Sequence, residues 1–189
     1  MKYSLYFRVW HWLHAIVILG LLGTVFLRKT FLSWRTNSEI LLNKLAEIDI
    51  TVTAEQAKVL AKAIRAGMWE WHIILGYGLV VLIGFRIYLF FKDTSNRDGF
   101  FDLDLHKKVV YLSYFIIYGT LIFMSISGLI IYFYQGLGLL KTTAHDIKEV
   151  HELVFQVIMY FVPLHIIGVI VAEHRDEKGL VSSMLNGKE

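Results

Sequence analysis

The sequence has no cysteine, only one proline and few charged residues: Asp, Glu, Lys and Arg make up 19% of its 189 residues. The lack of cysteine excludes disulfides, iron–sulfur clusters and haem attached covalently through a Cys-x-x-Cys-His motif. Soluble domains carry about 25% charged residues, which is more than this chain has. In addition, 56% of the chain is hydrophobic. Its basic residues form no block suited to nucleic acid, so no nucleic-acid partner is expected. The composition therefore indicates a membrane protein.

Four long apolar runs, at 9–27, 71–91, 109–134 and 153–172, stand out along the chain. A bilayer core about 30 Å thick needs roughly 20 apolar residues in a helix. The runs therefore predict an all-α fold, a transmembrane four-helix bundle, as a single domain over residues 1–189. The first run has no cleavage site and is expected to be a retained helix, not a signal peptide. Four spans place both termini on one side, and evenly divided Lys and Arg leave the orientation open.

The segment 28–70, between the first two runs, is the only sizeable loop, and it contains signals for two short helices. Asn37 or Ser38 is expected to cap the first. Thr53 followed by Gln56 has the spacing of a capping box for the second, which could continue into the next span. One interpretation places these helices on the membrane surface. The other makes them a docking site for a partner.

Eight histidines provide the main functional signal. A histidine within a membrane span is a functional candidate, although it can also simply bond to a neighbouring helix. They are His11, His14, His72, His106, His145, His151, His165 and His174. His151 and His165 are 14 residues apart, which in a helix is roughly 40° short of four full turns and a rise of about 21 Å. These two histidines are therefore expected on one face of the fourth helix, at two depths.

His72 and His11 are expected at the same two membrane depths as His151 and His165, respectively. His72 and His151 begin spans that both start on the side opposite the termini, whereas His11 and His165 lie near the termini side. The topology thus predicts two imidazole pairs, His72 with His151 and His11 with His165. Paired imidazoles hold a low-spin, electron-transferring haem iron with both axial positions filled, which predicts two b-type haems. A zinc or copper site would need clustered ligands, which the separation of about 21 Å opposes.

The sequence allows two interpretations for the ligand on the first helix and two for the role of Arg86. His14 lies one turn after His11, and either could be the ligand on the first helix. Arg86 follows His72 by 14 residues and so shares its face. Arg86 either binds a haem propionate or extends to the membrane interface. His106, His145 and His174 are expected in loop, tail or interfacial positions.

Small residues and the single proline add two expectations about the helices. Glycines in the apolar runs either leave space for haem or let helices pack closely. They are Gly20, Gly23, Gly76, Gly119 and Gly128. Pro163 lacks a backbone donor and should kink the fourth helix just before His165.

Three groups of residues carry a resemblance to a known family. These are Arg8-Val9-Trp10-His11-Trp12-Leu13, His72 with Gly76 and Arg86, and Lys148-Glu149-Val150-His151-Glu152 followed by His165. Across its four spans the sequence resembles the prokaryotic cytochrome b561 family. The resemblance implies two b haems with ligands at His11, His72, His151 and His165, and so favours His11 over His14. It also implies a multi-pass protein of the bacterial inner membrane with cytoplasmic termini. The loop 28–70 departs from the family pattern.

The function expected from these features is electron transfer across the membrane between the quinone pool and a donor or acceptor at the surface. The resemblance also allows a membrane-anchor cytochrome b subunit of a hydrogenase or formate dehydrogenase. A stand-alone superoxide:quinone oxidoreductase is a further alternative, for which Lys58, Lys62 and Arg65 could form a basic funnel. A haem-free transporter or scaffold is the remaining class. The uninterrupted spans and the lack of internal repeats oppose a transporter.

Overall fold

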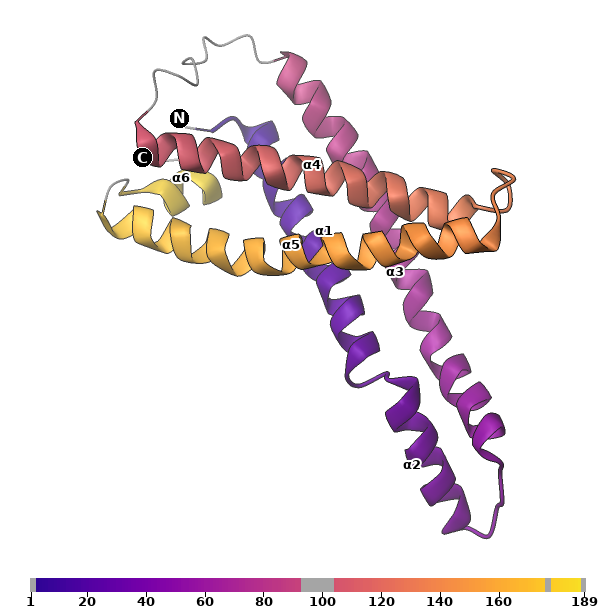
Figure 1. Cartoon of the computed structure of the whole chain (residues 1–189). Helices are drawn as coiled ribbons and strands as arrows, with labels where there is room; N and C mark the ends of the chain where they lie inside the picture. Colours follow the sequence, from indigo (N-terminus) through magenta and orange to yellow (C-terminus); the bar gives the residue numbers. More distant parts are fainter. Residues whose placement is uncertain (1–2, 93–103, 176–177, 188–189) are drawn as a thin grey trace. The chain divides into compact units, whose positions relative to one another are not determined.

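The computed structural model describes residues 3–92, 104–175 and 178–187, and these residues form helices and connecting turns without a β-strand. The helices are α1 (Leu5–Lys29), α2 (Trp34–Ala46), α3 (Ala54–Lys92), α4 (Leu105–Phe133), α5 (Lys141–Arg175) and α6 (Leu180–Leu185) (Figure 1). Within the described residues, four helical segments are long and apolar enough to cross a membrane: Leu5–Lys29, Ala54–Lys92, Lys107–Phe133 and Lys141–Arg175. The predicted all-α class with four membrane spans is therefore confirmed.

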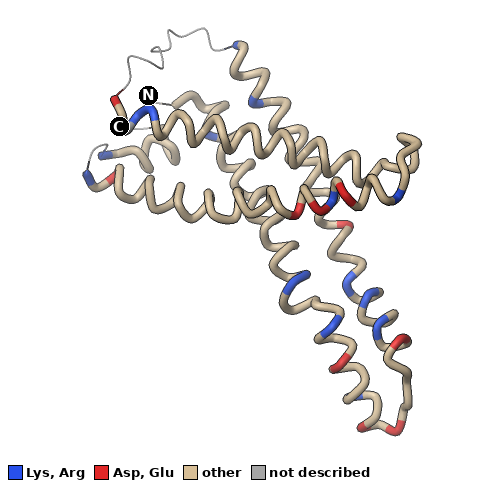
Figure 2. The backbone as a smooth tube through the Cα atoms, in the orientation of Figure 1, with Lys and Arg blue, Asp and Glu red and all other residues tan. Residues whose placement is uncertain are grey.

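The apolar side chains of these helices lie largely on their surfaces. Val81, Phe115 and Leu164, from three different helices, are 69%, 72% and 66% exposed. A water-soluble protein rarely exposes large apolar patches, whereas a helix in a bilayer turns them towards lipid. Figure 2 shows charged residues at the start of α4, along the first third of α5 and at the end of α5, with long uncharged stretches in both helices.

The loop 28–70 folds into α2 and the first turns of α3. Helix α2 begins one turn before the predicted start: its N-cap is Ser33, whose side chain makes no capping hydrogen bond. The predicted caps Asn37 and Ser38 are wrong, because both lie within the helix. The Ser38 hydroxyl instead donates to the Arg35 carbonyl at 2.8 Å, the local bond that serine makes inside a helix.

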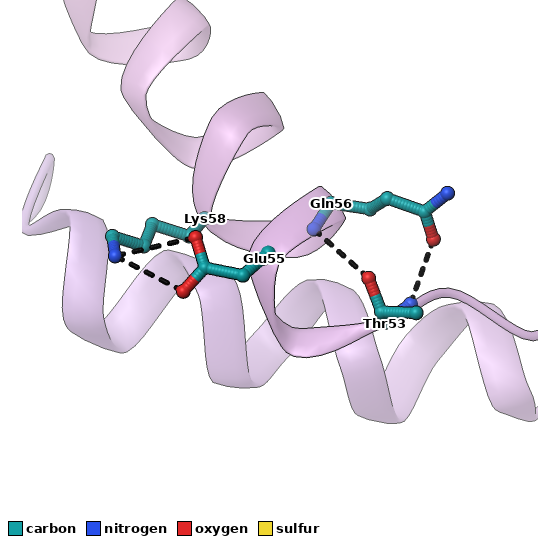
Figure 3. A network of polar contacts seen from close by, with 4 residues as sticks. All are labelled: Thr53, Glu55, Gln56 and Lys58. Carbon is teal, nitrogen blue, oxygen red and sulfur yellow. Dashed lines mark hydrogen bonds and ion pairs between the residues drawn. The ribbon is translucent and has the colours of Figure 1, made fainter.

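The predicted capping box at the start of α3 is confirmed (Figure 3). The Thr53 backbone N–H donates to Gln56 Oε1 at 2.8 Å, and the Gln56 N–H donates to Thr53 Oγ1 at 3.2 Å. From this cap, α3 continues for 39 residues to Lys92. The loop helix and the second membrane span are thus one continuous helix.

Helix α5 differs from its predicted bounds. It begins at Lys141 instead of near residue 153, and it continues through Pro163 to Arg175. His151 therefore lies well inside the helix, not at its start. His145 and His174, expected in loop or tail, both belong to α5. Likewise His106 lies in the first turn of α4, although its side chain is outside the described part of the chain.

The chain divides into two compact units, one made of Met1–Leu13 with Val80–Glu189 and the other of His14–Leu79. Helices α1 and α3 contribute to both. In the first unit, α4 and α6 pack against α5, and Trp10 Nε1 donates to the Leu82 carbonyl at 2.8 Å. The single domain over 1–189 stays a prediction.

In the second unit, the later part of α1 packs against α3 through small residues. A Cβ added at Gly20 would lie 2.9 Å from Leu75 Cδ1, and one added at Gly78 would lie 3.7 Å from Val17 Cγ2. Gly20 therefore serves close helix packing, one of the two roles considered for it. By contrast, a Cβ at Gly23, Gly76 or Gly119 would have open space around it.

Candidate haem-binding site

His11 of α1 and His165 of α5 lie together in the first unit. Their ring centroids are 6.3 Å apart, and the ring planes are inclined by 55°. Phe161, one turn before His165, stacks on its imidazole at 5.6 Å with an interplanar angle of 13°. Both histidines are only partly buried. The structure thus brings two imidazoles from different helices close together, with an aromatic ring stacked on one of them.

The distance between these rings fits two imidazoles that share one metal ion. For each ring, a metal–nitrogen bond of about 2 Å and roughly 1 Å from that nitrogen to the ring centre add up to about 3 Å. Two rings bonded to one metal ion would therefore have centroids roughly 6 Å apart. The observed 6.3 Å agrees. Direct hydrogen bonding or stacking between the two rings would bring them closer. His11 and His165 are therefore suited to hold a haem iron, although the ligand assignment stays a prediction.

His72 lies on α3 in the second unit, beside a hydroxyl of α1. Its Nδ1 atom is 2.8 Å from Thr24 Oγ1. The Thr24 hydroxyl is also 2.6 Å from the Leu21 carbonyl, to which it donates. The Trp69 ring packs edge-on against the imidazole at 5.6 Å, and the Arg28 guanidinium lies 4.7 Å over the centre of the Trp69 ring. Aromatic and hydroxyl contacts thus fix the orientation of His72.

His151 has a closely similar environment in the first unit. Its Nδ1 atom is 2.7 Å from Ser127 Oγ on α4, and the Ser127 hydroxyl donates to the Phe123 carbonyl at 2.7 Å. The next residue, Gly128, faces the imidazole, because a Cβ there would lie 3.6 Å from His151 Cε1. His72 and His151 belong to different units, so their pairing on one haem stays a prediction.

Arg86 lies among aromatic side chains in the first unit. Its guanidinium carbon is 5.2 Å from the ring centre of Phe7, 5.4 Å from that of Trp10 and 5.6 Å from that of Tyr118. Its Nε–H donates to the Tyr118 hydroxyl at 3.2 Å. Contacts of this kind stabilise a cation where water is scarce. They engage the faces of the guanidinium and one of its five N–H donors, which is compatible with a carboxylate at its edge.

The remaining histidines have other surroundings. His14 is buried, with 7% of its surface exposed, and belongs to the second unit, so it is His11 that lies beside His165. At the two ends of α5, His145 pairs with Glu149 at 3.6 Å, and His174 Nδ1 is 2.8 Å from the Ile170 carbonyl. Among the described residues, no three His, Cys, Asp or Glu side chains cluster as a zinc or copper site would require.

Thr24 and Ser127 are the site residues that the sequence analysis missed. A signal was present, because each is a hydroxyl next to a glycine inside an apolar run, as Gly23-Thr24 and Ser127-Gly128. Polar side chains are uncommon in such runs and usually have a partner on a neighbouring helix. Which partner they have depends on how the helices are rotated, and the sequence alone does not give that rotation.

Comparison with known proteins gives one match. The model of the family described as prokaryotic cytochrome b561 matches residues 2–187. No curated protein and no solved structure gives a significant match to the chain. The family match covers nearly the whole chain, including the loop 28–70, and it confirms the resemblance seen in the spans.

Proposed function

The chain belongs to the prokaryotic cytochrome b561 family, and from this premise we propose that it is a di-haem cytochrome b that carries electrons across the membrane. The family makes it a membrane b-type cytochrome that binds haem b and transfers electrons. The proposal adds two haems, held by His11 with His165 and by His72 with His151. The quinone pool is the partner inside the membrane, and the other donor or acceptor lies at the membrane surface.

The observation that carries this proposal is the approach of His11 and His165 to 6.3 Å between ring centroids. These residues come from opposite ends of the chain, and no local sequence preference brings them together. With a neutral imidazole from each, these two histidines would hold the haem iron and would leave it no open position for oxygen binding. Haem supplies the one-electron redox chemistry in such a site.

Helix α5 sets the distance between the two sites. It is helical without interruption from Lys141 to Arg175, so His151 and His165 are about 21 Å apart along its axis. That is a large part of a hydrocarbon core about 30 Å thick. Ligands at two such depths allow an electron to cross most of the membrane within one protein chain.

Arg86 is proposed to bind a propionate. Phe7, Trp10 and Tyr118 hold the guanidinium in one orientation, so little conformational freedom remains to be lost when a carboxylate binds its edge. An arginine within a membrane span needs an anionic or aromatic partner. The aromatic contacts orient the charge, and the propionate would neutralise it.

The protein is proposed to be a multi-pass protein of the inner membrane with cytoplasmic termini, which places His72 and His151 towards the periplasm. A second candidate function is that of a membrane-anchor subunit for a redox partner. It is supported by α2 and the first turns of α3, which give the loop 28–70 a folded, charged surface. There Lys58 and Lys62 of α3 approach the Trp34 ring of α2 at 5.7 and 5.8 Å.

The proposal is tested by counting haems in the purified protein and in two variants. The wild type should contain two b haems per chain by the pyridine haemochrome method. His72→Ala and His165→Ala should each reduce this to about one, because each removes one axial ligand of a bis-histidine site. The reduced-minus-oxidised spectrum identifies the haem that remains. Co-purification of a redox subunit would favour the anchor function over a stand-alone role.

His174→Ala is the matched control. His174 lies on the same helix as His165, but its imidazole bonds to the Ile170 carbonyl, so both haems should remain. A colourless wild type would contradict the proposal as a whole. Retention of two haems in His165→Ala would contradict the assignment of that ligand.

A further inference from the structure

Two hydroxyls within the membrane spans contact the same atom of two predicted haem ligands. Thr24 Oγ1 lies 2.8 Å from His72 Nδ1, and Ser127 Oγ lies 2.7 Å from His151 Nδ1. In each case the hydroxyl comes from a neighbouring helix, α1 for His72 and α4 for His151. The two contacts occur in different units of the chain, and they have the same chemical form.

The second bond of each hydroxyl determines which group donates. Thr24 Oγ1 is 2.6 Å from the Leu21 carbonyl, and Ser127 Oγ is 2.7 Å from the Phe123 carbonyl. A hydroxyl has one proton. If that proton pointed towards the imidazole, two oxygen atoms with lone pairs would face each other at these short distances. The proton therefore lies towards the carbonyl, and the hydroxyl oxygen accepts a hydrogen bond from the imidazole.

This direction fixes the tautomer of both histidines. An imidazole that donates from Nδ1–H and is neutral carries its free lone pair on Nε2. A lone pair on Nε2 is what a haem iron needs from an axial histidine. The hydrogen-bond chain runs from Nδ1–H to the hydroxyl and on to a helix carbonyl. Each bond in such a chain polarises the next.

We propose that Thr24 and Ser127 are positioning residues that hold His72 and His151 in the Nδ1-protonated form and lower the midpoint potential of the haem these histidines bind. The inference rests on the proposed function, which makes His72 and His151 haem ligands. A hydrogen bond accepted from the far nitrogen orients a ligating imidazole and increases its basicity. A more basic ligand stabilises ferric over ferrous iron, which lowers the potential.

The test for Thr24 compares Thr24→Val with Thr24→Ser. Valine has nearly the shape of threonine but no hydroxyl, whereas serine keeps the hydroxyl. Potentiometric titration, followed in the haem absorption bands, should show an upward shift in the midpoint potential of one haem in Thr24→Val. Thr24→Ser should stay near the wild-type value. The low-spin ferric EPR spectrum provides a second readout, since its g values follow ligand basicity.

Ser127→Ala and Ser127→Thr form the corresponding pair for His151. We expect an upward shift in Ser127→Ala and a potential near the wild-type value in Ser127→Thr. Removing a hydroxyl that bonds to a nearby backbone carbonyl could shift a potential indirectly, and two residues control for this. Thr30 donates to the Phe26 carbonyl and Ser113 to the Val110 carbonyl, both at 2.7 Å. Thr30 is exposed and Ser113 is partly exposed, and each bonds to a carbonyl instead of a histidine, so Thr30→Val and Ser113→Ala should leave both potentials unchanged.

The outcomes separate this inference from the proposed function. If Thr24→Val and Ser127→Ala retain two haems at wild-type potentials and g values, the inference is overturned and the di-haem function stands. A wild type without haem overturns the function itself. If Thr24→Val does not accumulate as a folded protein, Thr24→Ala provides the same comparison with a smaller side chain. An equal shift in the Thr30→Val control also overturns the inference.

Discussion

Arg86 is the one charged residue in the apolar run 71–91, and its surroundings show how this fold accommodates a charge. Three aromatic rings lie within 5.6 Å of its guanidinium carbon. Aromatic faces attract a cation without needing a buried carboxylate, and the Tyr118 hydroxyl accepts from Nε. Neither of the roles considered from the sequence, propionate binding or extension to the interface, included this aromatic enclosure.

The proposed propionate contact of Arg86 leads to a prediction about haem retention. Arg86→Leu should speed haem transfer from the purified cytochrome to apomyoglobin by about ten- to a hundredfold, the range expected for losing a hydrogen bond to a charged group. Tyr118→Phe keeps the aromatic ring and the arginine, so its transfer rate should remain near that of the wild type. An unchanged rate in Arg86→Leu would show that Arg86 does not bind a propionate.

Two glycines of α1 differ in how closely a neighbouring helix approaches them. Gly20 and Gly23 lie one turn apart on α1, but only a Cβ at Gly20 would be within 4 Å of a neighbour, at 2.9 Å from Leu75 Cδ1. An alanine usually stabilises a helix over glycine by about 0.5–1 kcal/mol. At Gly20 the overpacking of Leu75 opposes that gain.

The difference between these two glycines can be measured by thermal unfolding in detergent. Gly23→Ala should unfold at the wild-type temperature or slightly above it. Gly20→Val should destabilise the protein by about 1–3 kcal/mol, because its branched side chain cannot avoid Leu75. Replacing Leu75 by alanine in the Gly20→Val background should restore part of the loss. Equal stability of Gly20→Val and the wild type would contradict the packing role.

At the level of elements, the first turn of α3 depends on a cap, whereas that of α2 does not. Thr53 and Gln56 satisfy each other's backbone N–H groups, and Lys58 adds an exposed ion pair to Glu55 at 3.2 Å. Exposed pairs of this kind contribute little. The capping box is therefore the main local contribution to the start of α3.

Hydrogen exchange measured by mass spectrometry tests this difference. Thr53→Ala should weaken the first turn of α3 by about 0.5–2 kcal/mol, which increases exchange in peptides covering 54–58. Ser33→Ala should have little effect at the start of α2, because Ser33 makes no side-chain capping bond. Equal increases at the two helix starts would contradict the assignment of the cap.

For the whole molecule, the order of the spans determines which residues share a side of the membrane. Four candidate spans return the chain to the side where it began. We therefore expect the loop 28–70 on the opposite side of the membrane from α6. The chain has no cysteine, so single introduced cysteines can report on topology without background.

We expect Ile48→Cys to react with a membrane-impermeant maleimide in intact cells with a permeabilised outer membrane. Ile48 is 62% exposed and lies in the loop that we propose to be periplasmic. Lys178→Cys, also exposed, should react only after the cells are lysed, because it lies on the side of the termini. The reverse pattern would invert the proposed orientation, and labelling of both sites in intact cells would contradict the four-span topology.

The sequence by itself determined the membrane class, the four candidate spans and the capping box. These features depend on local composition and on the fixed rise and rotation of an α-helix. Sequence signals were less successful at helix ends. Ser33 and not Asn37 or Ser38 precedes α2, and α5 begins before its apolar run, because polar turns can extend a helix beyond the membrane.

Only the tertiary structure decided which side chains meet. The contacts of Arg86 with aromatic rings and the bonds between His72 and Thr24 and between His151 and Ser127 all join residues of different helices. Such contacts depend on how each helix is rotated about its axis and which neighbour it packs against. Helix packing sets both, through the combined fit of many side chains, and no single stretch of sequence contains that information.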